Sequence, residues 1–318
     1  MSDIKLQRTI ARFQAKIDGG AYYEAHQTLR TITNRYVKSK QYTEAIDLLY
    51  QGASILAQKK EYGSASDLIT YLIQVLEEAE ITCTKDYKMK LIDLINLLPD
   101  TDVSLADLAK QSISWSTKGS DSKFGDTELH SAFGVKFCRA IYIATGDEEE
   151  RAKLFAYAEL HLILGTHESL PYYVDFLYSW YEQQNDPTID PGVFLARAVM
   201  NYSYLKNFKF VNEAATIFID KLNLKVSNFE KIDANGSFIY NYKGYELLNF
   251  LQLLIITLGK SDSQQKFLKL YSQYKPVLTH FELLAPVEYL AKLYYNVQLG
   301  NPNGNQNMLA NLMGGLFK

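Results

Sequence analysis

Apolar residues recur along the chain at helical spacing, most regularly in its first third. A Tyr-x-x-Ala motif begins at Tyr22, Tyr42 and Tyr62, in steps of 20 residues, and each copy is followed by apolar residues three or four positions apart. That period is typical of an amphipathic helix. One helix per 20 residues gives a helical hairpin every 40, and small alanines beside tyrosines suit the packing of tetratricopeptide-like repeats. The pattern predicts stacked helical hairpins with the tyrosines in the core.

The helical period continues with less regular spacing toward the C-terminal end. The predicted helices cover residues 87–98, 105–115, 128–143, 149–164, 170–182, 193–204, 210–222, 247–258, 265–274 and 287–299. Residues 226–245 break this pattern, because aromatic and β-branched stretches flank an Asn-Gly pair, which is a strong hairpin signal. A two-stranded hairpin is not stable alone, so it must pack on helices or on a partner. The predicted fold class is all-α: a right-handed α-solenoid of tetratricopeptide-like helical hairpins, with one inserted β-hairpin near residues 226–245.

The length of 318 residues suits two compact domains or one elongated repeat structure. Seven prolines and 17 glycines leave little turn material for a many-stranded sandwich or barrel. We expect N-terminal helical repeats over residues 1–145, C-terminal repeats with the hairpin over 146–299, and a flexible tail rich in Asn and Gly over 300–318.

Charge is unevenly distributed along the chain. The net charge of −3 gives no general reason to expect a nucleic-acid partner. Residues 1–40 nevertheless hold eight basic and three acidic side chains, whereas residues 61–107 hold ten acidic and three basic ones. A surface of two signs suits a protein partner whose orientation is set by charge complementarity. The alternative is that these charges are ordinary solvated helix faces.

No motif for catalysis, nucleotide binding or metal binding is present in the sequence. We therefore expect no catalytic residues, no cofactor and no metal. Cys138 and His130 could pair as nucleophile and base, but Cys138 lies in an apolar helical stretch, where a buried inert thiol is expected. The most apolar run, residues 247–258, is too short to cross a membrane, and the N-terminus lacks the apolar core of a signal peptide. We expect a cytoplasmic protein without direct membrane insertion.

Five segments carry a family resemblance. They are AYYEAHQTLRTITNRYVKSKQYTEAIDLLYQGA from residue 21, SDLITYLIQV from residue 66, WSTKGSDSKFGDTELH from residue 115, LGTHES from residue 164, and FEKIDANGSFIYNYKGYELLNFLQLLIIT from residue 229. They resemble the Golgi-to-ER traffic protein 4 family, in family order over nearly the whole chain. The first segment is long enough to be specific, whereas LGTHES alone would be a weak signal.

The resemblance implies a non-enzymatic adaptor in the GET pathway, which inserts tail-anchored proteins into the endoplasmic reticulum after translation. In this family the N-terminal helices bind a targeting ATPase, favour its nucleotide-loaded dimer and restrain ATP hydrolysis until a client arrives. The C-terminal half binds the N-terminal segment of a ubiquitin-like protein, which recruits the co-chaperone that carries the client.

Carried over by motif, the residues that the resemblance places at the ATPase are Tyr22, His26, Arg30, Arg35, Lys38 and Asp67. Asp67 is implied to be the acidic element that modulates hydrolysis. Tyr22 is equally expected as a packing residue of the repeat. Because adjacent helix positions point about 100° apart, one of Tyr22 and Tyr23 can pack while the other is exposed.

For the ubiquitin-like partner, an amphipathic segment is expected between the hairpin and the following helix. The apolar wall would consist of Phe238, Tyr240, Tyr242, Leu247, Phe250 and Leu251. A sizeable exposed apolar patch would mark this site. The alternative is a hairpin that merely caps the end of the solenoid.

A second function fits the same repeat pattern. The chain could be a helical-repeat scaffold subunit of another cytosolic complex, of the lid or signalosome type, because such arrays share this arrangement of helices.

Overall fold

A computed structural model describes residues 2–120, 122–144, 148–233 and 238–300. Its internal contacts divide the chain into two compact units, Met1–Ser169 and Leu170–Lys318. The division falls after Ser169 rather than after residue 145, because the helix that follows residue 145 packs against the helix before it. Residues 301–318, where we expect a flexible tail, lie outside the described residues.

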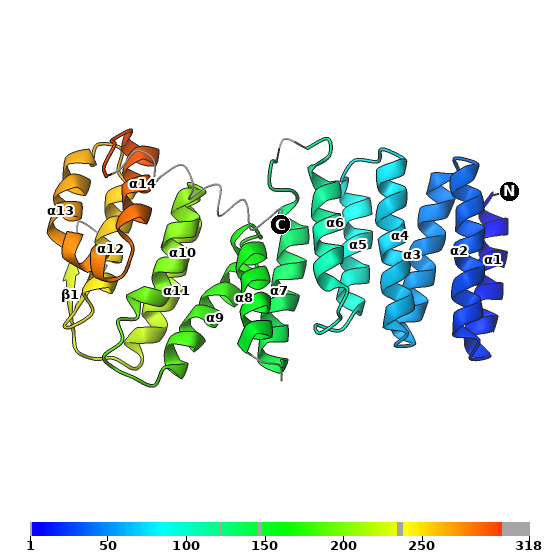
Figure 1. The fold of residues 1–318 in the computed structure, drawn as a ribbon, viewed down its shortest axis with the longest axis horizontal. Helices are drawn as coiled ribbons and strands as arrows, with labels where there is room; N and C mark the ends of the chain where they lie inside the picture. Colours follow the sequence, from blue (N-terminus) through cyan, green and yellow to red (C-terminus); the bar gives the residue numbers. More distant parts are fainter. Residues whose placement is uncertain (1, 121, 145–147, 234–237, 301–318) are drawn as a thin grey trace. The chain divides into compact units, whose positions relative to one another are not determined.

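The described residues of the first unit form helices that follow one another in chain order, coloured blue to green in Figure 1. These helices are α1 (Ser2–Asp18), α2 (Tyr22–Lys38), α3 (Tyr42–Gln58), α4 (Tyr62–Glu78), α5 (Lys85–Leu97), α6 (Leu105–Thr117), α7 (Thr127–Ile143) and α8 (Glu148–Ile163). Helices two apart in sequence pack together from α1 to α7, in addition to most sequence neighbours. This is the stacking of an α-solenoid, and it confirms the predicted fold class.

The 20-residue period has a clear structural basis. Helices α2, α3 and α4 begin at the three motif tyrosines, and the alanine three positions into each helix is fully buried. One residue in the turn after each of the first four helices has a left-handed backbone. The φ angles are 76° at Gly20, 58° at Lys40, 65° at Lys60 and 54° at Glu80. The next amide then donates to the carbonyl five residues earlier, as from Gln41 to Tyr36 at 2.9 Å, which closes a Schellman motif.

The second unit combines helices with a small antiparallel sheet (Figure 1). Its elements are α9 (Leu170–Gln183), α10 (Gly192–Tyr204), α11 (Phe208–Asn223), β1 (Phe229–Asp233), β2 (Phe238–Tyr242), α12 (Glu246–Leu258), α13 (Gln264–His280) and α14 (Leu284–Tyr295). The strands pair in the register Phe229 to Tyr242 through Asp233 to Phe238, and β2 packs on α12. The predicted hairpin is therefore confirmed, although its turn, residues 234–237, lies outside the described residues.

A single buried carboxylate connects two helices of this unit. Asp190 Oδ1 accepts from the Gly192 amide at 2.8 Å, and its two oxygens accept from the amides of Leu247 and Leu248 at 2.7 and 3.2 Å. It thus caps the first turns of both α10 and α12. Gly192 allows this approach, since a Cβ there would lie 2.5 Å from the Leu248 nitrogen.

Two helices end four or more residues away from the predicted last residue. Helix α13 continues beyond Tyr274 through Pro276 to His280. Pro276 has no amide hydrogen, so the Ser272 carbonyl lacks its usual helical donor. Because Ser272 is exposed, water can donate to that carbonyl instead. Helix α14 ends at Tyr295 rather than at 299, because Asn296 adopts a left-handed backbone with φ 55°.

Among the residues that the structure describes, no helix combines the length and the apolar character needed to span a bilayer.

Candidate docking sites

The first candidate site lies on neighbouring faces of α2 and α4. His26 and Arg30 are one turn apart on α2, and Asp67 lies in the first half of α4. His26 Nε2 is 2.8 Å from Asp67 Oδ2, and Arg30 Nη1 donates to both carboxylate oxygens of Asp67 at 2.5 Å. The Arg30 guanidinium also lies over the Tyr71 ring, 5.2 Å from its centroid. Three of the six predicted residues are therefore brought together.

The electrostatics of this cluster are set by the partners of Asp67. Partial burial raises the pKa of Asp67, but the hydrogen bonds from Arg30 and His26 outweigh it, so the pKa lies below its ordinary value. The side chains of Arg30 and Asp67 remain 40% and 39% exposed. The pair is therefore at the surface, where a partner can reach it, and Asp67 is already engaged within the chain.

The other three predicted residues stand apart from the cluster. Arg35 and Lys38 are exposed in the last turn of α2, and neither has an ion-pair partner in the described parts of the chain. Arg35 is nine positions from His26 and so lies about 180° around the helix. Tyr22 is partly buried, whereas Tyr23 is 75% exposed. Of the two tyrosines, Tyr23 is the one whose ring is exposed to solvent.

Sequence reasoning missed Tyr71, and of the two adjacent tyrosines it named Tyr22 for the partner rather than the more exposed Tyr23. Tyr71 is four positions after Asp67, so helical spacing could have placed its ring beside the carboxylate. Which of Tyr22 and Tyr23 is buried depends on how α2 rotates against its neighbours. That rotation is not readable from two adjacent tyrosines.

Much of the acidic surplus in residues 61–107 is engaged within the chain. Glu77 pairs with Lys118 at 2.8 Å, and Asp100 pairs with the buried Lys136 at 2.9 Å. Lys136 also donates to the Leu98 carbonyl just beyond the end of α5, at 2.7 Å. These carboxylates stabilise packing between helices, so they contribute less to a charged docking surface than the residue count indicates.

The second candidate site is the hairpin with α12, and here the sequence-based expectation of an exposed wall is wrong for the chain by itself. Phe238 is 58% exposed and Tyr240 is partly exposed. The other four predicted wall residues are buried, namely Tyr242, Leu247, Phe250 and Leu251. They are covered because α12 packs on α10, α11, α13 and β2, so the apolar face of α12 is used for folding.

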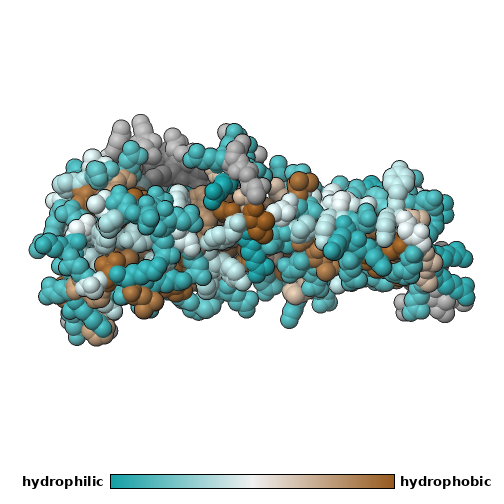
Figure 2. Space-filling model, turned by 90° about the horizontal axis from the view of Figure 1, so that it is seen from below, coloured by the Kyte–Doolittle hydropathy of each residue, from teal (hydrophilic) through white to brown (hydrophobic). Residues whose placement is uncertain are grey.

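Hydrophobic atoms on the surface gather in separate patches rather than in one large area, as Figure 2 shows for one face. The large exposed apolar side chains of the hairpin are Ile232 and Phe238. Phe238 is also covered in part by the Lys231 ammonium, which lies 3.9 Å from its ring centroid. The hairpin therefore offers a small aromatic surface beside a cation.

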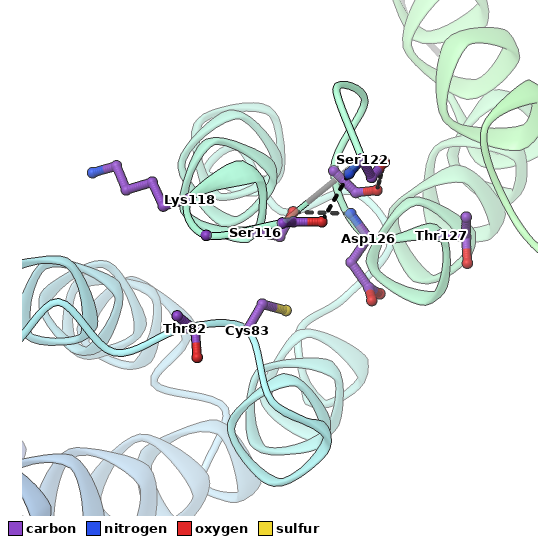
Figure 3. A pocket seen from close by; sticks show the side chains of 10 residues that line it. Thr82, Cys83, Ser116, Lys118, Ser122, Asp126 and Thr127 are labelled. Atoms are coloured by element: carbon purple, nitrogen blue, oxygen red, sulfur yellow. Dashed lines mark hydrogen bonds between the residues drawn. The ribbon is translucent and has the colours of Figure 1, made fainter.

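A polar cavity of about 380 Å³ lies in the first unit, between the loops α4–α5 and α6–α7. Figure 3 shows Cys83 and Asp126 directed toward it and Lys118 directed away. Asp126 caps α7 through the amides of Glu128 and Leu129 and pairs with Lys88 at 3.0 Å. Burial raises the pKa of the Cys83 thiol to about 11, with nearby Asp126 adding to the effect, so the reactive thiolate is disfavoured at neutral pH.

Two histidines meet in the core between α7 and α8. His130 Nε2 donates to the Phe124 carbonyl at 2.8 Å, so its Nδ1 accepts from His161 Nδ1, also at 2.8 Å. Burial lowers the pKa of both imidazoles, and that of His161 falls well below its ordinary value. Both ring nitrogens of His130 are thus engaged, and Cys138 is buried and forms no disulfide. In the described residues, no group of three or more His, Cys, Asp or Glu side chains is arranged to hold a metal ion.

Comparison with known proteins agrees with this architecture. The family model described as "Golgi to ER traffic protein 4" matches residues 39–317. Golgi to ER traffic protein 4 of Schizosaccharomyces pombe is 31% identical over 93% of this chain and 90% of its own length, and that of Aspergillus fumigatus is 30% identical over 81% and 75%. The crystal structure of C. therm. Get4 superposes with a TM-score of 0.81 at 28% identity, covering 99% of this chain and 96% of that one.

Stacked helical hairpins with a charged cluster near one end of the chain and a hairpin near the other define a helical-repeat protein of the solenoid class. Because the family model spans most of the sequence and the relatives align over most of both chains, the chain belongs to the Golgi to ER traffic protein 4 family.

Proposed function

We propose that the chain is a cytoplasmic, non-enzymatic adaptor in the insertion of tail-anchored proteins into the endoplasmic reticulum. It bridges a targeting ATPase and a ubiquitin-like protein, and through the latter a co-chaperone, and it regulates client handover and ATP hydrolysis. It needs neither nucleic acid nor direct membrane insertion for this role. The observation that carries the proposal is the family match over residues 39–317.

The ATPase binds at the N-terminal helices of the first unit. Two features support this assignment: the surface cluster of His26, Arg30 and Asp67, and the exposed cations Arg35 and Lys38 on the same helix. Unpaired surface cations steer an acidic partner, and a preformed ion pair such as Arg30 with Asp67 fixes the geometry of docking. Because Arg35 lies on a different side of α2 from the cluster, two variants are needed to test the surface.

Asp67→Lys and Arg35→Glu should each weaken ATPase binding by about tenfold at low salt, with a smaller loss at high salt because surface charges are screened. Calorimetry with the purified full chain and the nucleotide-loaded ATPase measures this. Asp107→Lys and Lys110→Glu are matched controls, since both residues are exposed on α6 and should leave the affinity unchanged.

The results of these binding measurements distinguish a wrong site assignment from a wrong function. Unchanged affinity and unchanged ATP turnover for both variants would show that the site assignment is wrong. If the wild-type chain bound neither the ATPase nor the ubiquitin-like protein, the adaptor role itself would be wrong, and a scaffold subunit of another complex would be the better explanation.

A further inference from the structure

Three helices of the second unit, α10, α12 and α14, end side by side. Helices α10 and α12 both begin at the Asp190 carboxylate and pack along each other, so they also end together. The Tyr294 hydroxyl in the last turn of α14 donates to the Ser203 carbonyl in the last turn of α10, at 2.9 Å. The start of α11 lies there too, because a Cβ at Gly259, directly after α12, would be 2.7 Å from the Phe208 ring. This end of the unit is opposite the hairpin, since β2 precedes the start of α12.

Five exposed lysines surround these helix ends, and they form what we call the basic end of the unit. They are Lys206, Lys209, Lys260, Lys266 and Lys292. None of them has an ion-pair partner in the described parts of the chain. The acidic residues closest to them in sequence are Asp262 and Glu213, and residues 301–318 contain no Asp or Glu. Near the hairpin, in contrast, the lysines of α11 and of the loop after it pair with acids of α9. The basic end therefore carries surplus positive charge.

Two of these lysines stand where folding alone favours the opposite charge. The N-terminus of a helix carries a partial positive charge, so a cation in the first turn lowers the stability of the helix. Lys209 lies in the first turn of α11 and Lys266 in the first turn of α13, and neither first turn contains an acidic residue. Helices α2, α5 and α7 each have an acid there instead. Helix stability does not explain Lys209 and Lys266, which indicates that they serve an anion outside the chain.

The surroundings of the lysines indicate which kind of anion suits them. Among the described residues, none of the large exposed apolar side chains lies at the basic end. A specific protein interface needs such side chains at its centre, and single-stranded nucleic acid needs exposed aromatic rings on which its bases stack. Lysine ammonium groups are separate, strongly hydrated point charges, which suit a diffuse layer of anions better than a bidentate contact. A membrane surface that contains acidic phospholipids is such a layer.

We propose that the basic end of the second unit adsorbs to membrane surfaces that contain acidic phospholipids. The contact is electrostatic, between the lysine ammonium groups and the lipid head groups, and it requires no insertion of apolar side chains. The five lysines lie outside both candidate docking sites, so this surface adds to the proposed function and does not depend on it. Adsorption by the basic end leaves the hairpin at the far end of the unit, directed away from the lipid.

Lys266→Glu and Lys275→Glu are a matched pair of variants on α13. Both lysines are exposed, but Lys275 lies nine residues further along the helix, which is about 13 Å and exceeds the Debye length of about 8 Å at physiological salt. The purified full chain should bind phosphatidylcholine vesicles that contain phosphatidylserine and should not bind vesicles of phosphatidylcholine alone. Lys266→Glu should lower the partition coefficient at least about tenfold, because each charge near such a surface contributes about fivefold. Lys275→Glu should lower it less than about threefold, and high salt should abolish binding of the wild type.

Urea unfolding of the same variants shows that lost adsorption is not lost folding. A carboxylate in the first turn of a helix is favourable, so Lys266→Glu and Lys209→Glu should each unfold at the same or a higher urea concentration than the wild type while they bind vesicles more weakly.

Three results would overturn the inference: equal losses for Lys266→Glu and Lys275→Glu, equal binding to vesicles with and without phosphatidylserine, or no vesicle binding by the wild-type chain at low salt. Binding of polyglutamate or of poly(U) RNA through these lysines, without vesicle binding, would also overturn it and would assign the basic end to a protein or an RNA partner. The adaptor role is decided separately, by the binding of the ATPase and of the ubiquitin-like protein.

Discussion

Arg30 holds both carboxylate oxygens of Asp67 through one guanidinium nitrogen, while its planar face lies over Tyr71. One nitrogen is therefore used within the chain, and the 40% of the side chain that is exposed leaves room for a partner's acid. Asp67, in contrast, already accepts hydrogen bonds from Arg30 and pairs with His26. On the proposed function, a partner's cation at Asp67 would have to compete with both of them, so docking there would exchange one ion pair for another.

The His130 and His161 pair should make the stability of the chain sensitive to acid. Both have pKa values lowered by burial, so between the folded values and about 6.5 the unfolded chain binds protons that the folded chain does not. The free energy of unfolding should therefore fall as the pH drops below about 6.5, by up to about 1.4 kcal/mol per pH unit for each such histidine. Urea unfolding at pH 7.5, 6.5 and 5.5 measures the slope.

His161→Gln removes one titrating group and should make that slope shallower, whereas His280→Gln, at an exposed position on α13, should keep the wild-type slope. A His161→Gln variant with the same pH dependence as the wild type would show that the buried pair does not carry the effect.

At the scale of elements, the turns at the ends of α1 to α4 explain the repeat period. Each needs one residue with a left-handed backbone, and of the four only Gly20 is a glycine. Lys40, Lys60 and Glu80 adopt that conformation at a cost of about 1 to 2 kcal/mol each. Tertiary packing of the neighbouring helices offsets this cost, which shows how strongly stacking dominates local preference here.

Gly20→Ala should therefore lower the free energy of unfolding by about 1 kcal/mol, although a Cβ at Gly20 would meet no atom within 4 Å. Gly63→Ala is the matched control: its Cβ also meets nothing within 4 Å, but Gly63 lies in the first turn of α4. There alanine should raise the stability, by up to about 1 kcal/mol. Urea unfolding followed by circular dichroism compares the two; a change of the same sign for both would refute the backbone explanation.

Most elements were predictable because each carries a local signal. The Tyr-x-x-Ala starts and the Asn-Gly pair mark helix and hairpin boundaries that the structure confirms. The end of α13 was not predictable, because a proline normally ends a helix. Pro276 is tolerated within α13 because the carbonyl that loses its hydrogen bond, that of Ser272, is exposed, and this exposure is not visible in the sequence. The burial of Leu247 and Phe250 was not predictable either. The apolar face of a helix can pack on other helices of the same chain or bind a partner, and the sequence does not distinguish these two cases. The structure does, because α10, α11 and α13 pack against α12.

At the scale of the whole molecule, the two candidate sites belong to different units, residues 22–67 to the first and the hairpin to the second. Phe238→Asp should therefore weaken binding of the ubiquitin-like protein by about tenfold or more, through loss of an aromatic contact worth about 1.5 to 3 kcal/mol. ATPase affinity should stay at the wild-type value, because no residue of the first unit is altered.

Val103→Asp is the control for adding a charge at an exposed apolar position, since Val103 is 97% exposed in the first unit. Both affinities should be unchanged for it. A Phe238→Asp variant that lost both partners equally would point to misfolding or to a shared site, and one that lost neither would remove the hairpin from the docking surface.

The Asp190 carboxylate has a consequence for motion in the second unit. The Asp190 side chain accepts hydrogen bonds from the first amides of both α10 and α12. If the start of one helix frays and Asp190 moves with it, the other helix loses its hydrogen-bond acceptor. The start of α12 lies only a few residues after β2. The hydrogen bonds from Asp190 to α12 therefore also resist loosening of the adjoining strand pair. Opening at this end of the unit is therefore expected to be a concerted event, in which the amides of Gly192, Leu247 and Leu248 lose protection together.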